Sequence, residues 1–290
     1  MRKTPFKITA LVLALVTALM LFGCVKPDDP EVVVDVGENT PVPATAAPTP
    51  APTDTPEPTP APTDTPEPTG EVNPALRKRK VYLTFDDGPY DYTDRVLDIL
   101  AQYNIKATFF TVGRFMFRHP DTLKRMAAEG HVIGSHTDSH DFNIIYKSPE
   151  AFLEDVAKWR EDLKAQVGYD AGAYVLRFPG GTTNSSIGGR SGRGAYVEAV
   201  NAAGYYAFDW SIGFNDKWLA GNTENLPKPE YFWQSYLETY SYYGKTDPLI
   251  VLIHDTEEES VNLLARLIED LLAKGFEFDT CDHIGDNFLM

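Results

Sequence analysis

From residue 81 onward, short apolar runs alternate with segments of helical periodicity. The runs typical of buried strands lie at residues 81–85, 107–112, 131–135, 173–178, 205–211, 249–254 and 276–280. The segments with helical spacing lie at residues 96–103, 120–130, 149–167, 195–203, 229–243 and 257–273. Seven strands that alternate with helices predict an α/β fold with a parallel sheet covered by helices. At this length either a barrel or a doubly wound sheet is allowed.

Prolines are concentrated ahead of this region. Fourteen of the 22 prolines lie between residues 25 and 74, in a stretch rich in Pro, Thr, Ala and acids. The stretch has no apolar periodicity, so it cannot bury one face. Such sequence extends by about 3.1 Å per residue, and about 50 residues reach on the order of 150 Å. We therefore expect a disordered linker at residues 25–76 and one folded domain at residues 77–290.

The first 24 residues have the layout of a secretory signal. A basic start precedes an apolar stretch at residues 8–23. As a helix this stretch is about 24 Å long, short of the ~30 Å hydrocarbon core, so an uncleaved anchor is the weaker interpretation. Its end, Leu21-Phe22-Gly23-Cys24, resembles the lipobox of bacterial lipoproteins. The resemblance implies a lipid on Cys24 that holds the protein at the outer face of the cytoplasmic membrane, in a bacterium that we expect to be Gram-positive; a secreted product is the other alternative.

The charge distribution excludes one class of partner. The net charge of −16 divides into +3 for residues 1–24, −9 for residues 25–74 and −10 for residues 75–290. An acidic folded domain argues against binding to nucleic acid or to an anionic membrane surface.

The two cysteines, Cys24 and Cys281, cannot form a disulfide framework, so the core must hold the fold. We expect a monomer whose membrane contact is the lipid alone.

Two adjacent carboxylates follow the first strand-like run. Asp86 and Asp87 precede Gly88 and Pro89. In parallel α/β folds, functional groups gather at the carboxyl ends of strands. Neighbouring side chains at a strand end diverge, so one carboxylate can bind a cation while the other accepts a proton. A turn built on the Asp-Gly-Pro sequence is the alternative.

Two histidines follow the third run. His136 and His140 are four residues apart, which predicts that both lie on one side of a helical turn and reach one ion. With a carboxylate from the neighbouring strand they predict a catalytic metal site that keeps open coordination positions. A chance pair of surface histidines is the alternative.

Two further candidates end the fourth and sixth runs. Arg177 precedes Phe178-Pro179-Gly180-Gly181, and we expect it to hold a carboxylate by a two-pronged hydrogen bond while the glycines expose backbone N–H groups. His254 follows five apolar residues, which places it at the mouth of the site as a general acid. A salt-bridged arginine and a structural histidine are the alternatives.

Four ordered motifs resemble those of the polysaccharide deacetylases with a NodB-homology domain, carbohydrate esterase family 4. They are Thr84-Phe85-Asp86-Asp87-Gly88-Pro89, His136-Thr137-Asp138-Ser139-His140, Arg177-Phe178-Pro179-Gly180-Gly181 and Leu252-Ile253-His254-Asp255. The resemblance covers about residues 79–285. It implies a distorted (β/α)7 barrel, in agreement with the seven runs.

The resemblance also implies roles. Asp87, His136 and His140 hold a divalent metal, usually Zn²⁺, with Co²⁺, Mn²⁺ or Ni²⁺ as other ions. Asp86 takes a proton from the water that attacks an acetamide carbonyl, and Arg177 orients Asp86 and keeps it ionised.

The remaining implied roles concern the oxyanion, the leaving group and the substrate. The N–H of Gly180 stabilises the oxyanion, and His254 protonates the departing amine. The substrate contacts are Pro179, Gly180, Trp210 and Leu252. A fourth family motif is altered: Gly213-Phe214-Asn215-Asp216-Lys217 keeps Asp216, while Asp209-Trp210 resembles a variant, so either Asp209 or Asp216 is expected to pair with His254.

The expected activity is hydrolysis of N-acetyl groups on the sugars of a cell-surface polysaccharide, with peptidoglycan as the first candidate because the linker reaches into the wall. Chitin oligosaccharide, poly-N-acetylglucosamine and acetylxylan are alternative substrates. A glycan-binding surface lipoprotein with a weakened active site is the alternative from another class. A metalloprotease is excluded because the chain has no His-Glu-x-x-His helix.

Overall fold

The computed structural model describes residues 79–168, 174–216 and 228–290. Several expected features lie outside the described residues: the signal at residues 1–24 with its Cys24, and the linker at residues 25–76. The same holds for Lys217 and for Ala173, the first residue of the fourth expected strand. Among the described helices, none has both the length and the apolar composition needed to span a membrane.

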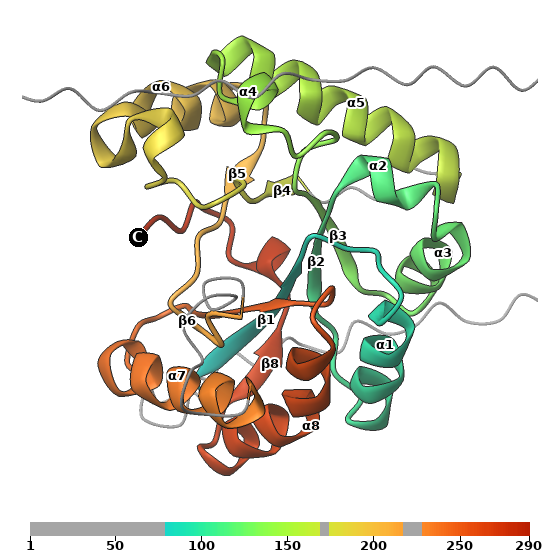
Figure 1. Cartoon of the computed structure of the whole chain (residues 1–290), viewed down its shortest axis with the longest axis vertical. Coiled ribbons are helices and arrows are strands. Elements are labelled where there is room, and N and C mark those ends of the chain that lie inside the picture. The colour runs from blue at the N-terminus through green and yellow to red at the C-terminus, as the bar shows by residue number, and fades with distance from the viewer. Residues whose placement is uncertain (1–78, 169–173, 217–227) are drawn as a thin grey trace, which may run out of the picture. The chain divides into compact units, whose positions relative to one another are not determined.

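One curled, parallel sheet forms the centre of the described domain (Figure 1). Its strands are β1 (Lys80–Asp86), β2 (Thr108–Thr111), β3 (Val132–Ser135), β4 (Val175–Leu176), β5 (Tyr206–Ala207), β6 (Ile212–Gly213), β7 (Leu249–His254) and β8 (Glu277–Asp279). Their order is β5-β4-β3-β2-β1-β7-β6, and β8 pairs with the start of β1. The α/β prediction is confirmed: the curled half-barrel is consistent with a distorted (β/α)7 barrel.

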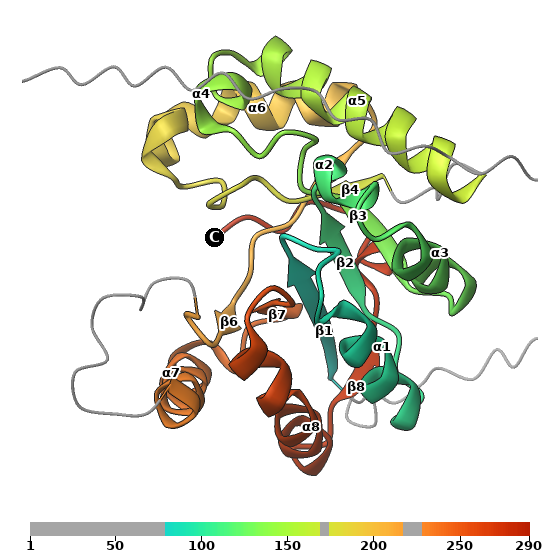
Figure 2. The ribbon, with the colours of Figure 1, turned by 45° about the vertical axis from the view of Figure 1, so that its right-hand side comes forward.

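Helices surround this sheet. The longer ones are α1 (Thr93–Gln102), α3 (Pro120–Ala128), α5 (Pro149–Val167), α6 (Gly189–Ala202), α7 (Lys228–Tyr243) and α8 (Glu258–Ala273). The short elements are α2 (Gly113–Met116), α4 (Phe142–Ile145), η2 (Ser185–Ile187) and η3 (Cys281–His283). Helices that are neighbours around the sheet pack on one another from α7 through α8, α1, α3 and α5 to α6 (Figures 1 and 2).

Helix α5 has the predicted bounds. Its first turn is capped by Ser148, whose hydroxyl accepts a hydrogen bond from the N–H of Ala151 (3.2 Å), and Pro149 occupies the first helical position. It ends at Gly168, which has a left-handed φ of 78°. The capping residues therefore fixed both ends of this helix.

The fifth expected strand is wrong as a single strand. Its residues form β5, which pairs with β4, and the adjoining β6 pairs with β7 at the other edge of the sheet. Residues 208–211 therefore cross from one edge to the other, and the N–H of Asp209 donates to the carbonyl of Phe288 (2.7 Å). A buried crossing has the same apolar composition as a buried strand, so the sequence pattern cannot separate them.

Strand β1 divides the core into two layers. Its outer face, with Val81, Leu83 and Phe85, packs in the cluster that includes residues of the surrounding helices. The inner face carries a second cluster, made of Tyr82, Phe110, Val175, Phe208, Ile250 and Cys281. Asp86 is four residues beyond Tyr82 and projects from this inner face where β1 ends. Cys281 is fully buried, and burial raises the pKa of its thiol to about 12.

Candidate active site

Three side chains from the ends of two strands converge at one point. Asp87 follows β1, whereas His136 and His140 follow β3. One donor atom from each residue lies within 4.8 Å of the others. Oδ1 of Asp87 is 3.5 Å from Nε2 of His136 and 3.4 Å from Nε2 of His140. The three residues predicted to be ligands are thus brought together.

The loop that carries the histidines is not a helical turn, so that part of the prediction is wrong. Residues 136–140 are irregular, and Thr137 and His140 adopt left-handed φ values of 69° and 51°. These residues turn the chain so that the two imidazole centroids lie 5.0 Å apart. Asp87 also has a left-handed backbone, with φ of 72°, so its side chain points in a different direction from that of Asp86. Left-handed backbone at non-glycine residues carries strain, which is common at functional sites.

The donor set fits a divalent metal ion. Nδ1 of His136 donates to the carbonyl of Arg177 (2.8 Å), which leaves the lone pair of Nε2 on the side of Asp87. Burial, the largest cause, lowers the pKa of His140 to about 4, which keeps the imidazole neutral. Neutral imidazoles and an ionised carboxylate are the forms that bind Zn²⁺ and similar ions.

Helix α5 supports the histidine loop from outside. Oδ1 of Asp155 accepts hydrogen bonds from the N–H groups of Asp138 (2.6 Å) and Ser139 (2.9 Å). Nζ of Lys158 donates to Oδ2 of Asp138 (2.6 Å). Asp155 is not part of any predicted site, although an acid on the buried face of this helix, directly before Val156, is a usable signal.

Asp86 lies beside the three converging residues and is held by Arg177. Asp86 is 2% exposed, and its Oδ2 is 3.7 Å from Nε2 of His136. Nη1 of Arg177 donates to Oδ1 of Asp86 (2.8 Å). A single guanidinium nitrogen makes this bond, so the expected two-pronged arrangement is wrong.

The crossing segment explains why Arg177 holds Asp86 with one nitrogen. Nε donates to the carbonyl of Phe208 (2.8 Å) and Nη2 to the carbonyl of Asp209 (3.0 Å). Nη1 also donates to the hydroxyl of Thr84 (2.7 Å). The guanidinium is fully buried, and the backbone carbonyls of residues 208 and 209 direct Nε and Nη2 toward the crossing segment rather than toward Asp86.

Asp216 is the carboxylate that pairs with His254. Nδ1 of His254 donates to Oδ1 of Asp216 (2.6 Å), and its backbone N–H donates to Oδ2 (3.0 Å). The hydroxyl of Ser260 also donates to Oδ2 (2.6 Å). Burial would lower the pKa of His254, but the charge and hydrogen bond of Asp216 outweigh it and raise the pKa to about 9. His254 is therefore protonated at neutral pH.

Asp209 has other partners. Its carboxylate accepts hydrogen bonds from the N–H of Thr182 (2.9 Å), the hydroxyl of Thr182 and the N–H of Met290 (3.0 Å). It ties the turn after β4 to the C-terminal segment. The two alternatives that the sequence left open are thus separated: Asp216 bonds His254, and Asp209 bonds the turn.

The expected substrate contacts surround the turn after β4. Gly180 and Gly181 have φ values of 75° and 77°. A Cβ atom at Gly180 would lie 3.3 Å from the ring of Phe142, and one at Gly181 would lie 3.1 Å from the ring of Trp210. The turn is held by Tyr146, whose hydroxyl donates to the carbonyl of Pro179 (2.6 Å). Within the described residues, no carbonyl or side chain accepts the N–H of Gly180.

Phe142 is a second residue near the site that the sequence motifs do not indicate. Its ring is 37% exposed and lies edge-on to His140, with centroids 5.8 Å apart. Leu252, by contrast, lies within β7, two residues before His254, and is 8% exposed. The only sequence signal for Phe142 is an aromatic residue two positions after His140.

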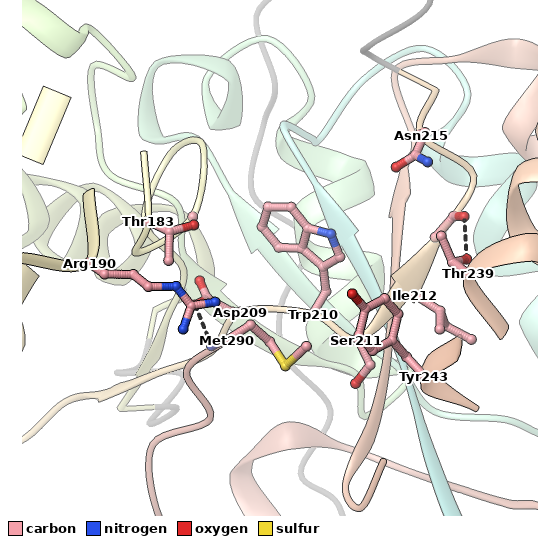
Figure 3. Close-up of a pocket in the computed structure, with 12 residues that line it drawn as sticks. Thr183, Arg190, Asp209, Trp210, Ser211, Ile212, Asn215, Thr239, Tyr243 and Met290 are labelled. Carbon is pink, nitrogen blue, oxygen red and sulfur yellow. Dashed lines mark hydrogen bonds between the residues drawn. The ribbon is translucent and has the colours of Figure 1, made fainter. Parts of the chain in front are cut away.

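Two cavities adjoin these residues. One, of about 340 Å³, is lined by Asp87 and His140 among others. The second, of about 290 Å³, lies over Trp210 (Figure 3). Arg190 and Thr183 form one of its walls and Asn215, Thr239 and Tyr243 the other. The second cavity is thus lined by the predicted substrate contact Trp210 and by Asn215, the residue before Asp216.

Comparison with known proteins decides the family. The sequence model of the family described as polysaccharide deacetylase matches residues 73–203. A peptidoglycan-N-acetylglucosamine deacetylase of Bacillus cereus is 33% identical over 205 residues, which cover 70% of each chain. The chain belongs to the polysaccharide deacetylase family. The resemblance seen in the motifs is confirmed, and members of this family are named as deacetylases.

Two further relatives agree with this assignment. The peptidoglycan-N-acetylglucosamine deacetylase PgdA of Listeria monocytogenes is 29% identical over 215 residues, 74% of this chain. The chain spans only 40% of the length of PgdA. The crystal structure of the catalytic domain of a peptidoglycan N-acetylglucosamine deacetylase from Eubacterium rectale is 34% identical. It superimposes with a TM-score of 0.60, covering 71% of this chain and 89% of that domain.

Proposed function

We propose that this deacetylase hydrolyses N-acetyl groups on the sugars of peptidoglycan with the help of a divalent metal ion. The observation that carries the proposal is the convergence of Asp87, His136 and His140 beside a second carboxylate, Asp86. The names of the relatives from Bacillus cereus, Listeria monocytogenes and Eubacterium rectale support peptidoglycan and N-acetylglucosamine as the substrate.

Asp87, His136 and His140 would hold the ion. We favour Zn²⁺, because two imidazoles and one carboxylate with open positions suit catalytic zinc, and Co²⁺, Mn²⁺ or Ni²⁺ would fit the same donors. When bound, the ion supplies positive charge that acidifies water and polarises a carbonyl group.

Asp86 serves as the general base. Its Oδ1 is tied to Arg177, so Oδ2 is the oxygen on the side of the histidines and accepts a proton from the attacking water. Arg177 is itself fixed by Thr84 and by the crossing segment, which sets the orientation of Asp86. Arg177 is thus a positioning residue.

Two groups complete the reaction. The N–H of Gly180 donates to the carbonyl oxygen as negative charge develops there. His254, protonated because of Asp216, gives a proton from Nε2 to the departing amine. Water and the acetamide thereby become acetate and a free amino sugar. Pro179, Trp210 and Leu252 would contact the sugar or its acetyl group.

The N-terminal sequence supports a cell-wall location. A signal at residues 1–24, a lipid on Cys24 and a proline-rich linker at residues 25–76 would hold a monomeric domain at the outer face of the membrane and within reach of the wall. Labelling with a radioactive fatty acid, lost in Cys24→Ala, would test the lipid. Persistent labelling of the variant would contradict it.

The activity is tested by acetate release. The purified, zinc-loaded protein should release acetate from peptidoglycan, and both a chelator and Asp86→Asn should abolish release. Asp91→Asn is the matched control, because Asp91 is an exposed aspartate on the same connection, with a side chain that is 74% exposed. If the zinc-loaded protein binds glycans but releases no acetate from peptidoglycan, chitin oligosaccharide, poly-N-acetylglucosamine or acetylxylan, it is a binding protein and the proposal is wrong.

A further inference from the structure

The short helix α2 is bonded to the histidine loop. The N–H of Gly113 donates to the carbonyl of Thr137 (3.1 Å), and the N–H of Arg114 donates to the carbonyl of Asp138 (3.1 Å). A Cβ atom at Gly113 would lie only 2.2 Å from Oδ1 of Asp138 and 3.1 Å from its Cα, so a larger residue would displace the loop. The position of Arg114 is therefore fixed relative to the loop that carries both histidines.

Arg114 lines the cavity that contains two of the proposed metal ligands. The cavity of about 340 Å³ is lined by Asp87, Tyr90, Val112, Arg114, Phe115, His140, Thr256 and Glu257. A substrate whose acetamide reaches Asp87 and His140 must therefore pass through or beside the space that Arg114 lines. Arg114 is exposed, so its charge is accessible to such a substrate.

No acid neutralises Arg114 within the part of the chain that the structure describes. Its guanidinium carbon lies 4.8 Å from the ring centroid of Phe115, and no ion pair engages it. Arg125 is different, because it pairs with Asp94, Asp98 and Glu129. An arginine without an acid partner in an acidic domain has its N–H groups available for a ligand.

We propose that Arg114 binds a carboxylate carried by the glycan near the reacting acetamide, so that the site prefers acidic over neutral glycans. This inference rests on the proposed deacetylase activity and narrows its substrate. Guanidinium groups recognise carboxylates through paired, charge-assisted hydrogen bonds. Peptidoglycan carries carboxylates on its peptide stems, and on its lactyl groups where the stem has been removed, whereas chitin oligosaccharides carry none.

Arg118 provides a matched control on the same segment. Its guanidinium carbon also stacks on Phe115, at 5.5 Å, and it is also exposed. It does not line the cavity with Asp87 and His140. If stacking on Phe115 were the whole function of these arginines, replacing either one should have the same effect.

The test compares Arg114→Gln, Arg114→Lys and Arg118→Gln in the zinc-loaded protein on three substrates. These are peptidoglycan with peptide stems, peptide-free glycan with lactyl carboxylates, and chitin oligosaccharide. Arg114→Gln should raise KM about tenfold on an acidic glycan, leave kcat within about twofold and leave chitin unaffected. Arg114→Lys should restore part of the loss, and Arg118→Gln should change nothing. The acidic substrate that responds identifies the lactyl group or the peptide as the source of the carboxylate.

An equal rise of KM on chitin oligosaccharide, or no rise on either acidic glycan, would overturn the inference. If the wild-type protein hydrolyses none of the three substrates, the proposed function fails separately, and calorimetric binding of the same glycans decides the inference. A selective loss of affinity for the acidic glycans in Arg114→Gln would then still support it. Equal affinities of Arg114→Gln and wild type for those glycans would end it.

Discussion

Two histidines in the active site are held in opposite states of protonation. We call Asp87, His136 and His140 the metal end of the site, and His254 with Asp216 the acid end. The pKa of His140, at the metal end, is lowered to about 4, whereas the pKa of His254, at the acid end, is raised to about 9. Burial lowers the pKa of both. At His140 burial dominates, and at His254 the carboxylate of Asp216 reverses it. These opposite shifts suit the proposed roles of His140 as a metal ligand and of His254 as a proton donor.

The backbone beneath the two histidines differs in the same way. His254 ends the regular strand β7, where its register with Asp86 of β1 is fixed by the sheet. His140 lies on an irregular loop with left-handed residues and depends on contacts from helix α5. We therefore expect the metal end to be more sensitive to substitutions outside the site than the acid end.

Removal of a metal ligand should have the largest effect. In His140→Ala, only Asp87 and His136 remain to hold the ion, so zinc affinity should collapse. Acetate release at pH 7 should fall on the order of 10³-fold, because the ion contributes several kcal/mol to catalysis. Zinc titration calorimetry and acetate release measure the two effects. His119→Ala, a histidine outside the site, is the control, and normal zinc affinity in His140→Ala would contradict the ligand assignment.

Loss of the carboxylate at the acid end should shift the pH profile. His254 in the wild type loses its proton near pH 9, so activity that needs the protonated form should fall above about that pH. In Asp216→Asn the pKa of His254 falls, the descending limb moves to lower pH, and activity at pH 7 drops about 10²-fold. Zinc affinity should not change. The pH dependence of kcat/KM measures the limb.

Asp209→Asn separates the two carboxylates that the sequence could not rank. Asp209 bonds Thr182 and Met290 rather than His254, so its replacement should leave the alkaline limb in place. It should instead lower the thermal midpoint, because a buried carboxylate with several N–H and O–H donors is lost. A limb that moves in Asp209→Asn and stays fixed in Asp216→Asn would reverse the assignment.

The predicted site residues that the structure brings together lie at strand ends. Asp87, His136 and His254 each follow an apolar run, and parallel strands bring their carboxyl ends together whatever the details of the loops. The family motifs supplied the roles. The same logic explains why most strands and the bounds of helix α5 were predicted: apolar runs and capping residues are local signals.

The remaining features depend on contacts between distant segments. The turn at residues 136–140 depends on left-handed backbone, which the four-residue spacing of the histidines does not encode. The crossing at residues 208–211 is as buried as a strand, and it supplies the carbonyls that limit Arg177 to one bond with Asp86. Asp155 accepts hydrogen bonds from residues seventeen and sixteen positions earlier in the chain, and no local sequence pattern predicts such contacts.

The smallest expected effect comes from removing the hydrogen bonds by which Asp155 supports the histidine loop. In Asp155→Ala, the N–H groups of Asp138 and Ser139 lose their acceptor, and the free energy of unfolding should fall by about 1–3 kcal/mol. Zinc affinity should fall about tenfold, because groups that orient metal ligands typically contribute this much. Asp155→Asn, which keeps an acceptor oxygen, should lose less.

The decisive comparison is between metal affinity and the pH limb. Asp162→Ala is the control for Asp155→Ala, because Asp162 lies on the same helix and accepts a hydrogen bond from the side chain of Lys158 (2.9 Å), whereas the acceptor of the backbone N–H groups of Asp138 and Ser139 is Asp155. Asp155→Ala should weaken zinc binding while the alkaline limb set by His254 stays near pH 9. If zinc affinity is unchanged although the free energy of unfolding falls, the histidine loop keeps its conformation without the hydrogen bonds from Asp155. The metal end would then be no more sensitive than the acid end to substitutions outside the site. If the limb moves as well, the ends are coupled, and the opposite tuning of the two histidines belongs to one network.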